Sequence, residues 1–348
     1  MPRSFIAGVG MYVPENVVTN FDLMKYMDTN DEWIESHTGI KERRFAKRLG
    51  ETTATMGIEA SKKAIENAGL TAKDIDFIIF ATITPDYQFP GCGVLVQREL
   101  DMRDIAALDI RNQCSAFIYA LSVGDQFIRS GMYKNILVIG SEKQSAWLDF
   151  STRGRKVSTI FADGAGAIIL QATEDAEKGV LSTHLHSDGK GAEALASVNP
   201  GTHSNHWNKD AADYDDAEIA DTFISKKMID KGQIYPHMDG NAVMKKAIVK
   251  LPEVINEALT ANNKTLEDLN MLILNQSNLR IAEYVQKKLG LADDEVFTNI
   301  QRYGNTTAAS IPIALCEAVQ QGKIKKGDLV CLASYGSGFT WSSTLIRW

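Results

Sequence analysis

The chain has 348 residues, of which 44% are apolar and 23% charged, and its net charge at pH 7 is -7. This balance is typical of a soluble globular protein and excludes a disordered or fibrous chain. The acidic charge argues against a nucleic-acid partner, which needs a basic surface opposite its phosphates. No apolar run reaches the roughly eighteen residues that a membrane span requires, and the start lacks the apolar core of a secretory signal. The four cysteines form no CxxC pair, so we expect reduced thiols and a cytoplasmic protein.

The first half of the chain alternates helical and strand patterns. Residues 53–69 have apolar side chains at helical spacing and end at Gly69, and the apolar run 74–84 follows as a buried strand. Residues 106–142 then pass from a polar turn through an apolar helix and a Gly/Lys turn into another strand. This order predicts a layered α/β fold.

The second half repeats the order of the first. Residues 242–278 again place a helix before a strand, and "TLEDLNMLIL" (265–274) is similar to "TAKDIDFIIF" (71–80). Residues 298–336 match 106–142 in the same way. We therefore predict a duplicated fold with sheets buried between helices and a functional site where the halves meet. The polar segment 183–235 lacks either period and is predicted to be an insertion over that site.

Cys114 stands out in "DIRNQCSAFIYAL" (109–121), between a predicted strand and a predicted helix. Unpaired N–H groups and the positive end of a helix dipole favour a thiolate there, so we interpret Cys114 as a candidate nucleophile. The competing interpretation is an inert core thiol, since free cysteines are among the most buried residues. Cys316 and Cys331 lie within apolar segments and fit that second interpretation.

Several further motifs occur in a fixed order along the chain. They are "DEWIESHTGIKERR" (31–44), "TPDYQFPG" (84–91), "IFADGAGAIIL" (160–170), "MDGNAVMKKA" (238–247), "LNQSN" (274–278), "YGNTTAAS" (303–310) and "SYGSGFTW" (334–341). With Cys114, they make essentially the whole chain resemble the 3-oxoacyl-acyl-carrier-protein synthase III family of thiolase-fold condensing enzymes. The resemblance implies a thiolase-like duplicated α/β/α/β/α layered fold. We divide it into an N-terminal half (1–180) with the nucleophile, an insertion or cap near the active-site entrance (181–236), and a C-terminal half (237–348).

The resemblance also implies an acyltransferase reaction of lipid metabolism, in fatty acid or polyketide biosynthesis. Cys114 would take an acyl group from acyl-CoA, and malonyl-acyl carrier protein would then lose carbon dioxide and attack the acyl-enzyme in a Claisen condensation. Asn305 matches the family asparagine that binds the malonyl thioester carbonyl. The backbone N–H groups of Cys114 and Ser337 would form the oxyanion hole. No metal and no cofactor besides these substrates is implied.

Asn275 departs from the family pattern, which has a histidine at this position. An asparagine can donate an N–H to an oxyanion, but it has no titratable nitrogen with which to exchange a proton. Loss of one such group costs on the order of 3 kcal/mol, so we expect condensation to be slow or absent. The substitution is either engineered or natural. The sequence therefore leaves two alternatives open, a non-condensing acyltransferase that passes the acyl group to an amine, hydroxyl or thiol, and a non-catalytic partner subunit.

The remaining positions carried by the resemblance are binding residues. Trp33 would stack on the CoA adenine beside Arg155, His37 stands where the family commonly has an arginine, and Asn241 and Asn278 would bind the pantetheine arm. Phe89 would close the acyl pocket of the partner in a homodimer. A basic patch would bind the acidic carrier protein; it comprises Lys245, Arg280, Lys287 and Lys288.

Two other motifs are rejected as functional sites. "GVGMYV" (8–13) is followed at once by Pro14 rather than by a helix, so it does not fit a dinucleotide-binding loop. "HSNH" (203–206) has two histidines but neither a helix to orient them nor cysteine ligands, so we do not predict a zinc site.

Overall fold

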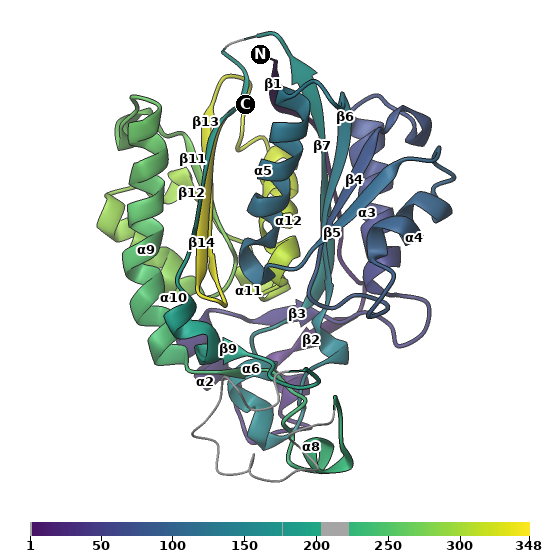
Figure 1. Cartoon of the computed structure of the whole chain (residues 1–348). Helices are drawn as coiled ribbons and strands as arrows, with labels where there is room; N and C mark the ends of the chain where they lie inside the picture. Colours follow the sequence, from purple (N-terminus) through teal and green to yellow (C-terminus); the bar gives the residue numbers. More distant parts are fainter. Residues whose placement is uncertain (1, 176, 203–222) are drawn as a thin grey trace.

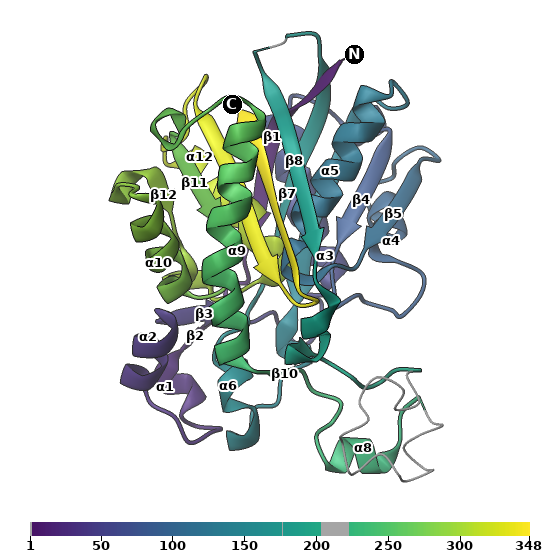
Figure 2. The same cartoon turned by 60° about the vertical axis from the view of Figure 1, so that its left-hand side comes forward.

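The computed structural model describes residues 2–175, 177–202 and 223–348. Their helices and sheets alternate in layers, with two helices between two sheets and further helices on the outer face of each sheet (Figures 1 and 2). This arrangement is the duplicated α/β/α/β/α layered fold that was predicted.

The first sheet has five strands in the order β1-β7-β6-β4-β5. The strands are β1 (Arg3–Tyr12), β4 (Phe77–Ala81), β5 (Ala106–Ile110), β6 (Asn135–Lys143) and β7 (Asp163–Thr173). The helices α3 (Thr53–Asn67) and α4 (Cys92–Glu99) pack against it from outside. The second sheet also has five strands, in the order β12-β11-β13-β14-β8. Its strands are β8 (Gly179–Ser187), β11 (Met271–Leu274), β12 (Val296–Phe297), β13 (Leu329–Gly336) and β14 (Thr340–Arg347), with α9 (Gly240–Ala261) and α10 (Leu279–Leu289) outside.

The two sheets have the same topology. In each, the first strand of the unit pairs antiparallel with the last, the last pairs antiparallel with the fourth, and the remaining pairs are parallel. Parallel strands need crossover helices, and these also correspond, because α5 (Ala116–Arg129) precedes β6 as α12 (Ser310–Gln320) precedes β13. The internal repeat inferred from the sequence is therefore a repeat of the fold.

The apolar patterns explain these elements. β4 is buried along its whole length, as its continuous apolar sequence predicts for a parallel strand covered on both faces. α3 begins after Thr52, whose side chain accepts a hydrogen bond from Thr55 N, and the chain turns at Gly69 with a φ of +69°. The predicted helix and strand are thus confirmed.

The start of the second unit differs from the predicted division of the chain. β8 (Gly179–Ser187) pairs with β14 and completes the second sheet, so most of this strand lies within the range predicted to be an insertion. Its sequence GVLSTHLHS does not alternate regularly between polar and apolar residues, and every residue after Val180 is partly or fully exposed because the strand lies at the edge of the sheet. The inserted segment therefore follows β8 and ends before α9.

The central helices α5 and α12 bind the two sheets together. Their apolar side chains share one core with both sheets, including Ile79, Leu121, Ile168, Leu315 and Leu332. Short elements lie below this core in Figure 1: β2 (Val17–Thr19), β3 (Glu42–Arg44), β9 (Leu195–Ala196), β10 (His237–Met238), α1 (Asn20–Leu23), α2 (Asp31–Thr38), α6 (Arg155–Ser158), α8 (Lys226–Asp230) and α11 (Ile300–Tyr303). The segments that follow the parallel strands of the two sheets meet next to these short elements.

Candidate functional site

Cys114 lies in a single 3₁₀ turn, Gln113–Ser115, that joins the end of β5 to the start of α5. This is the strand-to-helix junction that the sequence predicted. The preceding Gln113 has a φ of +48°, a conformation that is uncommon for a residue with a Cβ atom and that clusters at functional sites. The Cys114 side chain is 4% exposed.

The end of β13 packs directly on this turn. Ser334 Oγ donates a hydrogen bond of 2.7 Å to the Cys114 carbonyl. A Cβ atom added at Gly336 would lie 2.8 Å from Cys114 Cβ and 3.2 Å from Cys114 N, so the backbone of β13 approaches as closely as a glycine allows. The nucleophile candidate of the first half is therefore held in place by the second.

Asn305 is fixed by its own backbone and by its side-chain oxygen. Its N–H donates to Ile160 O at 2.9 Å and its carbonyl accepts from Ala162 N at 2.9 Å. The Oδ1 atom accepts a 2.9 Å hydrogen bond from Thr307 N. The oxygen end of the amide is thus occupied, and the NH₂ end is left to face the Cys114 thiol, whose pKa it lowers.

Asn275 directly follows β11 and is 7% exposed. Its backbone N–H donates to Ala333 O at 2.9 Å. The side-chain amide lies near enough to lower the pKa of the Cys114 thiol, but neither Nδ2 nor Oδ1 completes a hydrogen bond with a residue that the structure describes. A buried amide without partners is unfavourable, so this side chain is available to a ligand.

The electrostatics of Cys114 differ from the prediction. The pKa of the thiol is raised to about 12, first by burial and then by the negative charge of Glu142, while the nearby amides of Asn275 and Asn305 act in the opposite direction. The helix start therefore does not by itself favour a thiolate, because desolvation of the charged sulfur outweighs it.

Glu142 and Thr307 are site residues that the sequence analysis missed. Glu142, near the end of β6, is fully buried, and burial raises the pKa of its carboxyl to about 7. An acidic residue at the end of the apolar strand "NILVIGSEK" was a usable signal, because buried carboxylates are rare unless they have a role. Thr307 follows Asn305 in the quoted motif but was not singled out.

A cavity of about 630 Å³ opens in front of Cys114, whose side chain helps to line it together with Thr307 and Ser337. Residues 195–198, 200–202 and Phe223 also line it, so the segment inserted after β8 shapes the entrance. Ser337 Oγ donates a hydrogen bond to Leu195 O, which fixes the turn after β13 to this segment. Cys114 and Ser337 thus line one cavity, whereas Asn275 and Asn305 lie beside the Cys114 thiol without being among the residues that line the cavity.

The predicted adenine-binding residues Trp33, His37 and Arg155 form a second group, here called the Trp33 rim, and none of the three is among the residues that line the cavity. Trp33 in α2 lies between two partners, His37 with ring centroids 4.7 Å apart and Arg155 with its guanidinium carbon 4.8 Å from the Trp33 centroid. Asn278 Nδ2 donates to His37 O at 3.0 Å, and Arg280 Nε donates to Ser36 O at 3.0 Å. Figure 2 shows α2 and α10 on the same side of the molecule.

The other predicted binding residues, Asn241 and three lysines, lie further apart from one another. Asn241 and Lys245 are exposed in the first turns of α9. Lys287 and Lys288 are exposed in the last turn of α10, roughly 12 Å along the helix axis from the end that contacts α2. The structure does not place these two lysines at the rim that holds Trp33.

Phe89 belongs to the exposed loop before α4 and is 87% exposed. It does not line the cavity of its own chain, although Pro85 and Gln88 of the same loop do.

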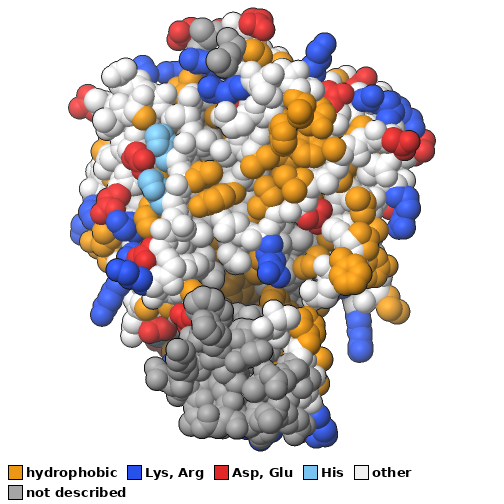
Figure 3. Space-filling model, in the orientation of Figure 1, with side chains coloured by type: hydrophobic (Ala, Val, Ile, Leu, Met, Phe, Trp, Pro, Cys, Tyr) orange, Lys and Arg blue, Asp and Glu red, His pale blue; other side chains and the backbone are white. Residues whose placement is uncertain are grey.

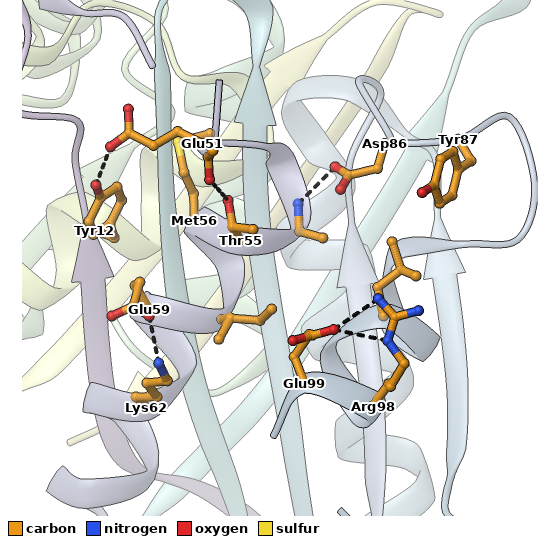
Figure 4. Close-up of a pocket in the computed structure, with 14 residues that line it drawn as sticks. Tyr12, Glu51, Thr55, Met56, Glu59, Lys62, Asp86, Tyr87, Arg98 and Glu99 are labelled. Carbon is orange, nitrogen blue, oxygen red and sulfur yellow. Dashed lines mark hydrogen bonds and ion pairs between the residues drawn. The ribbon is translucent and has the colours of Figure 1, made fainter. Parts of the chain in front are cut away.

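A second cleft, of about 520 Å³, lies between α3 and α4 (Figure 4). Its charged groups are paired locally: Lys62 with Glu59, Arg98 with Glu99, and Glu51 with the hydroxyl of Tyr12. None of the described residues that line it is a cysteine or a histidine, so they offer neither a thiol nor an imidazole.

No group of three or more His, Cys, Asp or Glu side chains is placed to hold a metal ion in the described ranges. The "HSNH" sequence at 203–206 lies outside them. Within those ranges, no helix is both long and apolar enough to span a membrane.

Comparisons with known proteins agree with the geometry of the Cys114 site. Residues 108–189 match the family profile described as 3-oxoacyl-[acyl-carrier-protein] synthase III, and residues 259–348 match the profile of the C-terminal part of that enzyme. The chain is similar to β-ketoacyl-[acyl-carrier-protein] synthase III of Serratia proteamaculans, with 44% identity, and of Yersinia pseudotuberculosis, with 42% identity. In both comparisons 98% of each chain is covered.

Solved structures of synthases are similar to this chain over nearly its whole length. The crystal structure of 3-oxoacyl-[acyl-carrier-protein] synthase III from Aquifex aeolicus superposes with a TM-score of 0.87 and 40% identity, covering 99% of this chain and all of the other. The priming β-ketosynthase of the R1128 polyketide pathway superposes with a TM-score of 0.85 and 28% identity, covering 99% of this chain and 96% of the other.

The contact between β13 and the Cys114 turn predicts the effect of a single methyl group. Gly336→Ala should lower the free energy of unfolding by about 1–3 kcal/mol, because the added Cβ overpacks the turn. Gly189→Ala is the matched control, since no atom lies within 4 Å of its added Cβ, and it should change the value by less than about 0.5 kcal/mol. Urea denaturation of both variants measures this, and equal losses would contradict the described contact.

Proposed function

Because this chain belongs to the 3-oxoacyl-[acyl-carrier-protein] synthase III family, we propose that it condenses an acyl group from acyl-CoA with malonyl-acyl carrier protein through Cys114. The observation that carries this proposal is the position of the Cys114 side chain, which lines a cavity beside the amides of Asn275 and Asn305. The reaction uses covalent catalysis and divides acyl transfer from carbon–carbon bond formation.

In the first step, the Cys114 sulfur attacks the thioester carbonyl of acyl-CoA and the CoA thiol leaves. The carbonyl oxygen becomes negatively charged in the tetrahedral intermediate and is stabilised by the backbone N–H groups of Cys114 and Ser337. The contacts of Ser334 and Gly336 with the Cys114 turn support this role, because they fix both ends of the proposed oxyanion hole relative to each other.

In the second step, the malonyl thioester binds with its carbonyl oxygen at the NH₂ group of Asn305 and loses carbon dioxide. The resulting carbanion attacks the acyl carbonyl carbon, the bond from that carbon to the Cys114 sulfur breaks, and the sulfur leaves as a thiolate while the 3-oxoacyl thioester is released. Asn275 donates a second N–H to the developing oxyanion, which satisfies its otherwise unpaired amide. An amide cannot carry a proton to or from the sulfur, so we propose that condensation is impaired relative to acylation.

The substrates enter past the rim formed by Trp33. We propose that the CoA adenine inserts between the Trp33 indole and the Arg155 guanidinium and stacks on the indole. In the structure, the guanidinium lies over this face of the indole. Asn241 and Asn278 bind the pantetheine arm. His37 holds the opposite face of the indole. Arg280 and Lys245 meet the acidic carrier protein near this rim, with Lys287 and Lys288 acting from further along α10 by attraction at a distance.

A homodimer is proposed from the free edge of the first sheet. β5 pairs with β4 along one edge, and its Leu108 side chain is 38% exposed. Figure 3 shows hydrophobic side chains on the face that carries α5 and β5, and an unpaired edge beside apolar surface is a site for strand addition. Phe89 then reaches the acyl pocket of the partner. The four free cysteines are consistent with the reducing cytoplasm as the site of this activity.

The proposed function is tested by incubation with acyl-CoA and mass spectrometry. We expect one acyl adduct, on Cys114, and malonyl-dependent release of carbon dioxide when malonyl-acyl carrier protein is added. Cys114→Ala should lose both. An adduct without carbon dioxide release would assign acyl transfer to another acceptor, and the absence of any adduct would refute the enzymatic proposal.

A histidine introduced at position 275 should affect condensation and acylation of Cys114 differently. Asn275→His is expected to raise the condensation rate by at least ~10-fold while self-acylation changes less, because a titratable nitrogen returns to the decarboxylation site. Steady-state rates of carbon dioxide release and single-turnover acylation rates give the comparison. Equal condensation rates in both proteins would show that another group already performs the task of the histidine.

The dimer proposal predicts the effect of one charge at the strand edge. Leu108→Asp should shift the wild-type dimer towards monomer in sedimentation velocity, because the carboxylate would be buried without a partner. Tyr284→Asp is the control, since Tyr284 is a similarly exposed apolar residue on α10, outside the other sheet. A monomeric wild-type protein, or equal behaviour of the two variants, would contradict the proposal.

A further inference from the structure

Glu142 is tied to a single segment that follows β4. Its carboxylate accepts hydrogen bonds from Thr82 Oγ1 at 3.2 Å, Ile83 N at 3.2 Å and Thr84 Oγ1 at 2.6 Å. The side chain has no exposed surface. These three hydrogen bonds hold the buried carboxyl group in place and partly offset the free-energy cost of burying its charge.

Thr307 links this carboxyl group to the site. Its hydroxyl lies near enough to Glu142 to lower the pKa of that carboxyl, and it accepts a 3.1 Å hydrogen bond from Gln144 Nε2. Its backbone N–H donates to Asn305 Oδ1. Thr307 has a φ of +47°, which is strained for a β-branched residue and persists when surrounding contacts enforce it. The contacts thus run from Glu142 through Thr307 to Asn305 and Cys114.

The negative charge of Glu142 also raises the pKa of the Cys114 thiol, and so disfavours the thiolate directly. It acts in the same direction on the pKa of the buried Cys92 thiol. Lys143 turns away and donates to Lys47 O and Glu51 O. The buried Asp163 on the neighbouring strand accepts from Ser145 and from Ala46 N instead. Asp86 accepts from Thr52 and Ala54 N.

We propose that Glu142 is a positioning residue that also controls the reactivity of Cys114. Its carboxyl group holds Thr307, and through Thr307 the amide of Asn305, while its negative charge, when present, disfavours the Cys114 thiolate. The inference rests on the proposed function in one respect, that Cys114 is the nucleophile.

The direction of the pH dependence follows from the chemistry. Burial raises the pKa of Glu142 to about 7, so the carboxyl is neutral below that pH and charged above it. When Glu142 is neutral, it carries no charge that opposes ionisation of Cys114. As the pH rises through about 7, the new negative charge opposes ionisation of Cys114, and thiolate formation increases less steeply than it does for an isolated thiol.

The test is the rate of alkylation of Cys114 by iodoacetamide, followed by peptide mass spectrometry from about pH 6 to about pH 8.5, in the wild type and in Glu142→Gln. Glutamine keeps the size of the side chain and removes the titrating charge. The ratio of the variant rate to the wild-type rate should rise by at least ~3-fold over this range, because the charge that slows the wild type appears only as the pH rises. A merely structural change would shift the rates without this pH dependence.

Asp163→Asn is the matched control, because it also removes a buried carboxyl whose pKa is raised, to about 6, one strand away. Its ratio to the wild type should be constant with pH. If Glu142→Gln does not fold, the wild type alone still tests the inference. Its Cys114 alkylation rate must then rise less than tenfold per pH unit near pH 7. A constant ratio for Glu142→Gln, or a tenfold rise per unit throughout in the wild type, would overturn this inference alone. A Cys114 that is unreactive at every pH would overturn the proposed function instead.

Discussion

The site depends on the close packing of β13 against the turn that carries Cys114. Each half of the duplicated fold ends its parallel strands on the same side, and the two sets of strand ends meet there. Gly336 lets the second half approach the backbone of Cys114, and Ser334 holds the carbonyl of that turn. Interiors packed this closely are rigid, so the nucleophile and the turn after β13 keep a fixed geometry without help from a substrate.

This rigidity has an electrostatic consequence. A sulfur held between two sheets is removed from water, and desolvation opposes the charge that makes it reactive. The amides of Asn305 and Asn275 stabilise the thiolate, whereas the carboxyl of Glu142 opposes it. No histidine of the described residues lines this cavity, so the balance among these neighbouring groups determines the reactivity of Cys114. In the proposed second step the same amides would bind the charge that develops on the malonyl thioester, so one arrangement would serve both proposed steps.

Much of the fold could be predicted because its signals are local. Buried parallel strands such as β4 are continuously apolar, and the similarity between residues 71–80 and 265–274 revealed the duplication. β8 was assigned to the insertion because an edge strand with one wet face has a weak pattern. At the proposed site, Cys114 and Asn305 were selected from their motifs, and their roles stay predictions. The opposing effect of burial on the thiol and the role of Glu142 depend on contacts between distant segments, which no local pattern encodes.

The central claim is that two halves of the chain build one acyl-transfer site around a single sulfur. A crystal structure of the protein after reaction with acyl-CoA tests it most directly. The account predicts an acyl group on Cys114 with its carbonyl oxygen within hydrogen-bonding distance of the N–H groups of Cys114 and Ser337. An acyl group on another residue, or an oxygen directed away from both N–H groups, would contradict it.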